Sequence, residues 1–293
     1  MAERVTVIVN PKAGRGRGGR MIPEITARFA ETGITDIRTT SSPGDERAIA
    51  RDAIANGATT VAVVGGDGTT NHVANAILDS GQDVRLAILP AGTGNDFAKV
   101  VGTNTNDIAS VAMLCAHPGG VRVDVGKVED HYFMNCCGFG FDVAVLEGIE
   151  RTPWLTGNAV YLYTALRELL SYKGTRASLG GEATDLYMLV VVANSEYFGG
   201  MFRIAPGARV TDGELDAIAV RNVSNSRRLK IFSAAVSGDH ARFPECTMDR
   251  AASFKLSFAE PPSYEADGEL HRARSSDLTV TCCPGALRVV TAQ

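Results

Sequence analysis

The sequence predicts an α/β domain followed by a mostly antiparallel β domain. Over the first 125 residues, runs of β-branched residues alternate with segments whose apolar residues recur at helical spacing. That alternation is typical of a parallel sheet covered by helices. From residue 132 onward the pattern changes to short apolar runs separated by turns, which indicates antiparallel strands. We therefore expect two domains, at residues 1–125 and 126–293, and the sequence leaves open whether the last strand returns to the first domain.

Composition supports two domains and narrows the class of protein. The chain has 293 residues, 45% of them hydrophobic, and a formal net charge of -4. That length is long for a single core, and that charge argues against a general nucleic-acid partner. No apolar run approaches the roughly 20 residues of a membrane span, and residues 1–10 lack the apolar centre of a signal peptide. We expect a cytoplasmic protein whose six cysteines are reduced, because they form no Cys-x-x-Cys motif.

The first domain is predicted to alternate four strands with helices. In a parallel sheet the carboxyl ends of the strands meet at one edge, which is where open α/β sheets bind ligands. We therefore expect the four loops at that edge to form a ligand site. The predicted strands cover residues 5–9, 37–40, 61–64 and 86–89, two helices cover 21–31 and 45–56, and the loops cover 10–14, 40–44, 65–70 and 90–96.

The second domain is predicted to contain short strands with two helical insertions. The insertions cover residues 161–172 and 226–237, where apolar residues recur at helical spacing. The strands are expected at residues 132–136, 186–193, 215–220, 254–258, 278–282 and 287–290.

The chain is organised around the glycine-rich loop after the third strand. Gly65, Gly66 and Gly68 let the backbone approach a bulky anion, and free amides at the start of the following helix favour negative charge. Thr69 or Thr70 can cap that helix. Asp67 would repel a bare phosphate, but a divalent cation can bridge a carboxylate to phosphate oxygens. The simpler interpretation is a glycine-rich turn in which Asp67 caps the helix.

A second loop of similar chemistry follows the fourth strand. Residues 90–98 again supply glycines, a hydroxyl and a carboxylate, so Asp67 and Asp96 are expected to converge from neighbouring strand ends. Near the N-terminus, Gly14, Gly16 and Gly19 satisfy the spacing G-x-G-x-x-G of dinucleotide-binding proteins. That motif is weak here, because the second strand ends in Thr-Thr where the fingerprint needs a carboxylate.

Three motifs in order resemble the diacylglycerol kinase catalytic family, which includes sphingosine, ceramide and bacterial lipid kinases. They are N-P-x-x-G at residues 10–14, G-G-D-G-T at 65–69 and P-x-G-T-x-N-D-F-A at 90–98. The segments at 135–142, 194–201, 204–208 and 212–216 also look like parts of that family. The resemblance implies a Rossmann-like nucleotide-binding domain of the NAD kinase/phosphofructokinase type, a C-terminal β-sandwich lipid-kinase domain, and transfer of phosphate from ATP to a lipid hydroxyl with Mg²⁺.

The resemblance also implies roles for particular residues. Catalytic Mg²⁺ would be held by Asp67, Asp96 and Asp124, directly or through water, and a structural Mg²⁺ by Asp212 with the backbone at Arg209 and Glu214. An Asp-Gly at this second place is otherwise most often a tight turn. The expected ATP contacts are Asn10, Pro11, Gly14, Thr40, Gly65, Gly66, Asp67, Gly68, Thr69, Thr70, Asn71, Thr93, Asn95 and Asp96.

Phosphoryl transfer to an alcohol needs a proton acceptor near the attacking hydroxyl. Residues 266–269, Ala-Asp-Gly-Glu, would by themselves suggest another hairpin turn. The family's D-G-E motif carries a glutamate proton acceptor, which here is Glu269, with Asp267 beside it. No P-loop or protein-kinase motif occurs in the chain.

The acceptor and the partners are less constrained by the sequence. Trp154, Leu155 and the helix with Tyr161, Leu162, Ala165, Leu166, Leu169 and Leu170 offer an apolar face for a lipid or a bilayer, although such a stripe is more often core. The resemblance implies a peripheral membrane enzyme that makes phosphatidic acid from diacylglycerol. Alternatives are a soluble NAD-kinase-like enzyme, which shares Gly-Gly-Asp-Gly but has a different loop in place of residues 90–98, and a non-catalytic nucleotide-binding regulator. The sequence leaves open whether the chain forms a homodimer.

Overall fold

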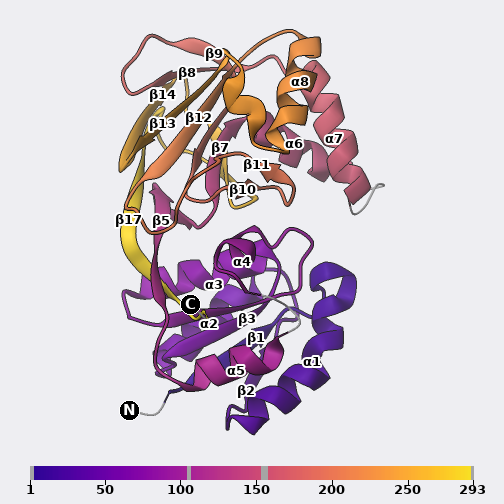
Figure 1. Ribbon diagram of the computed structural model, residues 1–293, viewed down its shortest axis with the longest axis vertical. Helices are drawn as coiled ribbons and strands as arrows, with labels where there is room; N and C mark the ends of the chain where they lie inside the picture. The colour runs from indigo at the N-terminus through magenta and orange to yellow at the C-terminus, as the bar shows by residue number, and fades with distance from the viewer. Residues whose placement is uncertain (1–2, 104–106, 153–157, 292–293) are drawn as a thin grey trace. The chain divides into compact units, whose positions relative to one another are not determined.

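The computed structural model describes residues 3–103, 107–152 and 158–291. The chain forms two compact units, one of residues 1–125 with 284–293 and one of residues 126–283. The last residues of the chain thus belong with the first unit. Figure 1 traces the path of the chain through both units.

The first unit is built on a parallel sheet in the order β2-β1-β3-β4. Val5 pairs with Thr60 across β1 and β3, and Thr60 pairs with Arg85 across β3 and β4. The inner strands β1, β3 and β4 are buried and mostly apolar because both faces of the sheet are covered, whereas the edge strand β2 is polar and only partly buried. This confirms the predicted parallel α/β region. The strands are β1 (Val5–Val9), β2 (Asp36–Thr39), β3 (Thr60–Gly65) and β4 (Arg85–Pro90), and the end of β17 (Asp277–Val289) adds to β4 in parallel.

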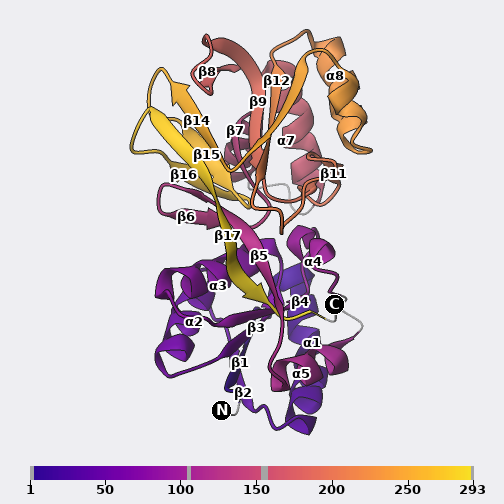
Figure 2. The same ribbon diagram turned by 60° about the vertical axis from the view of Figure 1, so that its left-hand side comes forward.

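Helices cover both faces of this sheet. Figure 2 shows α2 and α3 on one side and α1 and α5 on the other. Ile25 and Phe29 of α1 pack with Val111 and Cys115 of α5 on the buried sheet residues. The helices are α1 (Ala13–Glu31), α2 (Asp45–Ala55), α3 (Asp67–Ser80), α4 (Asp96–Val100) and α5 (Ile108–Ala116).

The first helix differs from the prediction. It was expected to begin near residue 21, but α1 begins at Ala13 and is interrupted at residues 14–16 by left-handed backbone. Gly14 has φ 55° and Gly16 has φ 83°, which glycine adopts without strain, and Arg15 shares this conformation at φ 56°. The Gly/Arg-rich segment is therefore a kinked helical start, where the sequence suggested an open loop.

The second unit is a mostly antiparallel β domain, as predicted. Strand β9 pairs antiparallel with β7, β8 and β12, and β15 pairs with β7 and β16. Buried side chains such as Phe139, Tyr264 and Val280 form one core, and a second core lies where helices cover β9 and β12. The strands are β5 (Val121–Val128), β6 (His131–Phe133), β7 (Cys136–Gly140), β8 (Thr175–Leu179), β9 (Asp185–Ala193), β10 (Tyr197–Phe198), β11 (Phe202–Arg203), β12 (Leu215–Arg221), β13 (Cys246–Ala251), β14 (Ser253–Phe258), β15 (Ser263–Ala266), β16 (Glu269–Arg272) and most of β17.

Three predicted strands were wrong in their boundaries. The strand expected at 132–136 is divided between β6 and β7, because the backbone amides of residues 134–136 turn to bind a carboxylate. The strands expected at 278–282 and 287–290 are one strand, β17, which continues through Pro284 and Gly285. Its early part pairs with β14 and its last residues with β4.

The described residues of the second unit form the α-helices α6 (Phe141–Glu150), α7 (Asn158–Ser171) and α8 (Asn225–Ala235) and the short 3-10 helix η1 (Asp239–Arg242). Of the apolar stripe predicted on α7, Leu169 is buried in the core, whereas Leu166 and Leu170 are 50% and 46% exposed. Trp154 and Leu155 lie outside the described residues, as do the side chains of Tyr161 and Leu162. Within the described ranges, no helix has the length and hydropathy needed to cross a bilayer.

Candidate functional site

Three loops pack against one another at the carboxyl edge of the first sheet, and glycines make this contact feasible. A Cβ added to Gly14 would lie 2.0 Å from the carbonyl oxygen of Ala91. A Cβ added to Gly92 would lie 2.5 Å from the Cα of Gly66. Any side chain at these positions would separate the loops that follow β1, β3 and β4. The backbones of the three sequence motifs are therefore in direct contact.

Asp67 joins two of these loops through hydrogen bonds. Its Oδ2 accepts from the backbone N–H of Asn95 at 2.6 Å, and its Oδ1 accepts from that of Asp96 at 2.6 Å. The simpler sequence interpretation had Asp67 capping its own helix, but its carboxylate binds the amides at the start of α4. Asn95 has φ 53°, and its side chain closes its own loop by accepting from Gly92 N and donating to Gly92 O. Asp67 thus fixes the loop after β4.

The polar side chains around Asp67 hold the loops in place. Asn10 donates from Nδ2 to Thr69 Oγ1 at 3.0 Å, and its Oδ1 accepts from Lys12 N at 3.0 Å. Thr70 donates to the carbonyl oxygen of Gly66 at 3.0 Å. The other predicted ATP contacts differ in place and exposure. Thr93 is exposed, whereas Thr40 and Asn71 are buried. Pro11 lies in the loop after β1, Gly65 ends β3, and Gly14 and Gly68 lie in the first turns of α1 and α3.

Asp96 and Asp124 are buried carboxylates that already have partners. Asp96 forms an ion pair with Lys99 at 2.8 Å, and Asp124 accepts from Gly285 N at 2.7 Å. In the part of the chain that the structure describes, no three His, Cys, Asp or Glu side chains gather into a group that could hold a metal ion. These oxygens still suit Mg²⁺, which keeps several waters and binds through one or two carboxylates and substrate phosphates. The donor set thus fits an ion that arrives with a nucleotide better than a metal caged by protein alone.

In the second unit, Asp267 anchors the turn that carries Glu269. Asp267 and Gly268, with φ 50° and 88°, form a two-residue hairpin turn between β15 and β16. The Asp267 carboxylate accepts from the backbone N–H groups of Met134 at 2.8 Å, Asn135 at 2.8 Å and Cys136 at 3.1 Å. These contacts are those of a structural anchor.

Glu269 is the first residue of β16 and lies opposite Ala266 in the hairpin. Its side chain is intermediate in exposure, whereas Asp267 is buried. Of the two acids in Asp-Gly-Glu, Glu269 is therefore the one that solvent and ligands can reach.

A pair of buried carboxylates beneath this turn was missed by the sequence reasoning. Glu265 on β15 is fully buried, and its Oε2 accepts from the N–H of Gly268 at 2.7 Å. Asp142, the first-turn acid of α6, is 4% exposed. The available signal was an acidic residue within a strand, between Tyr264 and Ala266. Acidic side chains are rarely buried unless they have a partner, so a buried acid at this position would have predicted a second group beside it.

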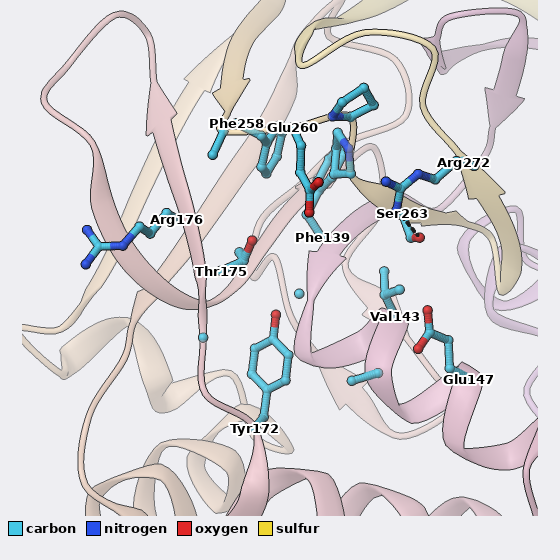
Figure 3. Close-up of a pocket in the computed structure, with 16 residues that line it drawn as sticks. Phe139, Val143, Glu147, Tyr172, Thr175, Arg176, Phe258, Glu260, Ser263 and Arg272 are labelled. Carbon is cyan, nitrogen blue, oxygen red and sulfur yellow. Dashed lines mark hydrogen bonds between the residues drawn. The ribbon is translucent and has the colours of Figure 1, made fainter.

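A cavity of about 360 Å³ lies in the second unit (Figure 3). Its apolar walls include Phe139, Val143 and Phe258, and the Tyr172 side chain extends toward it. Arg272 points toward Ser263, and Arg176 extends away from the cavity. The lining also includes charged side chains such as Glu147, Glu260 and Arg272, so the walls are of mixed polarity.

The Asp212 turn is polar and partly exposed. Asp212 Oδ1 accepts from the N–H of Glu214 at 3.1 Å, and Gly213 has φ 76°. The guanidinium of Arg250 lies 3.9 Å from Asp212 Oδ2 and 2.9 Å from Asp216 Oδ1. The protein thus provides a positive charge near Asp212, and Arg209 is exposed.

Two family models together match nearly the whole chain. Residues 4–128 match the family described as diacylglycerol kinase catalytic domain, and residues 135–291 match the YegS C-terminal NAD kinase beta sandwich-like domain. The chain is 27% identical to a diacylglycerol kinase of Mycobacterium tuberculosis over 98% of this chain and 94% of that protein. It is 30% identical to a probable lipid kinase YegS-like of Pseudomonas aeruginosa over 94% of this chain and 91% of that protein.

A solved structure agrees at the level of the fold. The crystal structure of a diacylglycerol kinase from Bacillus anthracis str. Sterne is 24% identical, with a TM-score of 0.75 and coverage of 99% of this chain and 97% of that chain. The predicted combination of a parallel α/β domain with a β-sandwich-like domain is therefore confirmed. The chain belongs to the bacterial diacylglycerol kinase and YegS-like lipid kinase family.

Proposed function

We propose that this protein transfers the γ-phosphate of ATP to the hydroxyl of diacylglycerol and so makes phosphatidic acid. The observation that carries the proposal is the hydrogen bonding of Asp67 to the amides of Asn95 and Asp96, because it builds a preorganised glycine loop in a lipid kinase family. Relatives named diacylglycerol kinase favour this acceptor over other lipids.

In this proposal the first unit binds the nucleotide. Backbone N–H groups of the loops after β1, β3 and β4 would bind the phosphates, because unpaired amides at loop and helix starts favour anions. The exposed hydroxyl of Thr93 and the buried Thr40 would contribute further contacts, whereas Asn10, Thr69 and Thr70 would act by holding the loops.

Mg²⁺ would be associated with Asp67, Asp96 and Asp124, directly or through water. When bound, it would neutralise the phosphate charge that grows as the γ-phosphoryl group is transferred. Asp67 and Asp96 place their carboxylates after β3 and β4, where the N–H of Asp96 donates to Asp67 and Lys99 pairs with Asp96. Asp124 lies on β5, and its carboxylate accepts from the N–H of Gly285.

Glu269 would accept the proton of the acceptor hydroxyl. The hydroxyl oxygen forms a bond to the γ-phosphorus, the bond from that phosphorus to the β–γ bridging oxygen breaks, and ADP leaves. The hydroxyl proton passes to the Glu269 carboxylate. Asp267 supports this step by anchoring the hairpin turn through three backbone amides, so that Glu269 is held in one orientation.

Membrane association is part of the proposal, because diacylglycerol resides in a bilayer. The exposed Leu166 and Leu170 on α7 support a peripheral contact with lipid. A homodimer is compatible with this mode of binding and is tested by measuring the mass in solution.

A second Mg²⁺ at Asp212, with the backbone at Arg209 and Glu214, is a separate proposal. It requires the ion to compete with the guanidinium of Arg250, which lies 3.9 Å from the Asp212 carboxylate. Calorimetric titration of the nucleotide-free protein with Mg²⁺ should show a site that is lost in Asp212→Asn.

The direct test is transfer of labelled γ-phosphate from ATP to a panel of acceptors in mixed micelles. The panel holds diacylglycerol, monoacylglycerol, ceramide and sphingosine, with NAD as a soluble control. Labelled phosphatidic acid supports the proposal. Labelled NADP without a lipid product would favour a soluble NAD-kinase-like enzyme, and ATP binding with no transfer would favour a regulator.

A further inference from the structure

Two carboxylates from different elements meet over one glycine beneath the turn that carries Glu269. A Cβ added to Gly138 on β7 would lie 1.6 Å from Asp142 Oδ2 and 2.9 Å from Glu265 Oε1. Both oxygens therefore occupy the space where any other residue would have its side chain. Glycine at position 138 lets the two acids approach each other inside the domain.

The hydrogen bonds of the two acids leave one buried oxygen without a partner. Asp142 Oδ1 accepts from Val143 N at 2.8 Å, but its buried Oδ2 has no hydrogen-bond partner among the residues that the structure describes. Glu265 Oε2 accepts from Gly268 N at 2.7 Å, and its Oε1 lies 3.6 Å from Cys136 Sγ. A buried acceptor without a donor is costly, so a donor is expected at Asp142 Oδ2.

The charges around the pair are negative or absent. Asp267 on the turn, Cys136 and Cys137 on β7 and Tyr172 following α7 are the titratable groups that interact with the two acids. Neither acid has an ion pair with Lys or Arg within the described part of the chain. Burial raises the pKa of Glu265 well above its usual range, and burial raises the pKa of Asp142 to about 7.

We propose that Asp142 and Glu265 share one proton between Oδ2 and Oε1, and that this pair is a positioning device for Glu269. Two carboxylates that are buried and this close to each other cannot both ionise without a compensating cation. One proton supplies the donor that Asp142 Oδ2 lacks and leaves one negative charge, which the N–H of Gly268 stabilises. The device acts through Glu265, which binds the Gly268 N–H in the turn immediately before Glu269.

Loss of the shared proton would disturb the turn. A second charge would appear beside Glu265 and repel its carboxylate, which weakens its hydrogen bond to Gly268. Glu269 would then lose its fixed orientation. The turn is ordered when the pair holds its proton. Glu269 is therefore held in position below the apparent pKa of the pair, and this orientation is lost as pH rises through that pKa.

Infrared spectroscopy in D₂O tests the shared proton without any enzymatic reaction. Wild-type protein at neutral pH should show the carbonyl band of a buried protonated carboxyl group, which disappears as pH rises. Asp142→Asn and Glu265→Gln should each lack that band, because an amide N–H replaces the shared proton. A wild-type protein without the band, or variants that retain it, would overturn the proposal.

Kinetics test the positioning role, which rests on the proposed function of Glu269. Wild-type kcat should fall at alkaline pH by about tenfold per pH unit once the shared proton is lost. Asp142→Asn and Glu265→Gln should keep kcat near the wild-type value at neutral pH and lose this alkaline decline, while KM for ATP stays unchanged.

Glu245→Gln is the matched control, because Glu245 is in the same unit, pairs with Arg227 at 2.9 Å and has a lowered pKa. It should retain the wild-type pH profile. If the amide variants keep the alkaline decline, the positioning role is wrong. If no lipid kinase activity exists, the infrared result still decides whether the proton is shared, so the two failures are distinguishable.

Discussion

Asp67 Oδ1 accepts the backbone N–H of Asp96 at 2.6 Å, and this bond connects the first residue of α3 to the first residue of α4. The sequence suggests that these two acids are neighbours at a metal. In the structure, the side chain of Asp67 forms a hydrogen bond with the backbone of Asp96. The Asp67 carboxylate consequently has two functions to be separated by experiment: it shapes the loop, and in our proposal it is associated with Mg²⁺.

Asp67→Asn should weaken both functions. An amide group can accept from only one of the two N–H groups that Asp67 binds, so one partly buried N–H loses its partner, which costs about 1–3 kcal/mol. We expect a lower free energy of unfolding and weaker binding of Mg·ATP, measured by denaturant unfolding and by calorimetry with and without Mg²⁺.

Asp83→Asn provides the control for Asp67→Asn. Asp83 is an acid of the same unit, and its ion pairs with Arg122 and Arg288 lie at the surface. Its loss should cost less than about 1 kcal/mol and leave ATP binding unchanged. Equal effects of the two variants would argue against a special role for Asp67.

Gly14→Ala should disrupt the contact between the first and last nucleotide loops. Gly14 has φ 55°, and a Cβ there would lie 2.0 Å from Ala91 O. Gly33 has φ 81° with nothing within 4 Å of an added Cβ, so Gly33→Ala has the backbone cost of about 1 kcal/mol without the collision. Thermal unfolding should show the larger loss in Gly14→Ala, and only that variant should lose ATP affinity. Similar losses in both variants would mean that the loop contact contributes little.

Asp267→Asn should misplace the hairpin turn. The carboxylate accepts three backbone N–H groups, and the Nδ2 group of asparagine would instead face at least one of them as a second donor. We expect a loss of about 2 kcal/mol in unfolding free energy and a reduced kcat, with KM for ATP little changed. Unaltered stability would show that Asp267 does not anchor the turn.

Glu269→Gln should remove the proton acceptor and leave the fold intact. Glutamine keeps the size of the side chain but cannot accept a proton at neutral pH, so kcat should fall by about 10²–10⁴-fold. Calorimetry should give the wild-type affinity for ATP, because Glu269 belongs to the second unit and the nucleotide loops to the first. Normal turnover would mean that another group accepts the proton.

Asp142→Asn should become more stable than wild type as pH rises. The pKa of Asp142 is raised in the folded protein, so the folded state retains a proton that the unfolded chain releases above about pH 4. The unfolding free energy of wild type should therefore fall, relative to the variant, by up to about 1.4 kcal/mol per pH unit between the unfolded pKa and the raised folded pKa. A constant difference across this range would mean that Asp142 is ionised in the folded protein.

The elements that could be predicted from the sequence are those with strong local patterns. Strand β1 occupies the predicted residues 5–9 because all five of its residues are buried and four of them are apolar. Helix α6 was not predicted, because it begins directly after the glycine-rich end of β7 without a polar break. Helix α4 has five residues, which is too short for a periodic pattern.

The candidate site was predictable in part for the same reason. Asp67, Asp96 and Glu269 stand in motifs with glycines and turn residues, which are local signals. The contacts of Asp267 are not local, since its N–H partners lie 131 to 133 residues away. Likewise, the approach of Asp142 to Glu265 depends on β7 lying beside β15, which pairing of strands decides and no short pattern encodes.

The most direct test of the account is the rate at which wild-type protein transfers labelled phosphate from ATP to diacylglycerol in mixed micelles, measured with Mg²⁺ and with chelator. We predict labelled phosphatidic acid that forms only with Mg²⁺. Absence of labelled phosphatidic acid under conditions in which the protein binds ATP would contradict the proposed function.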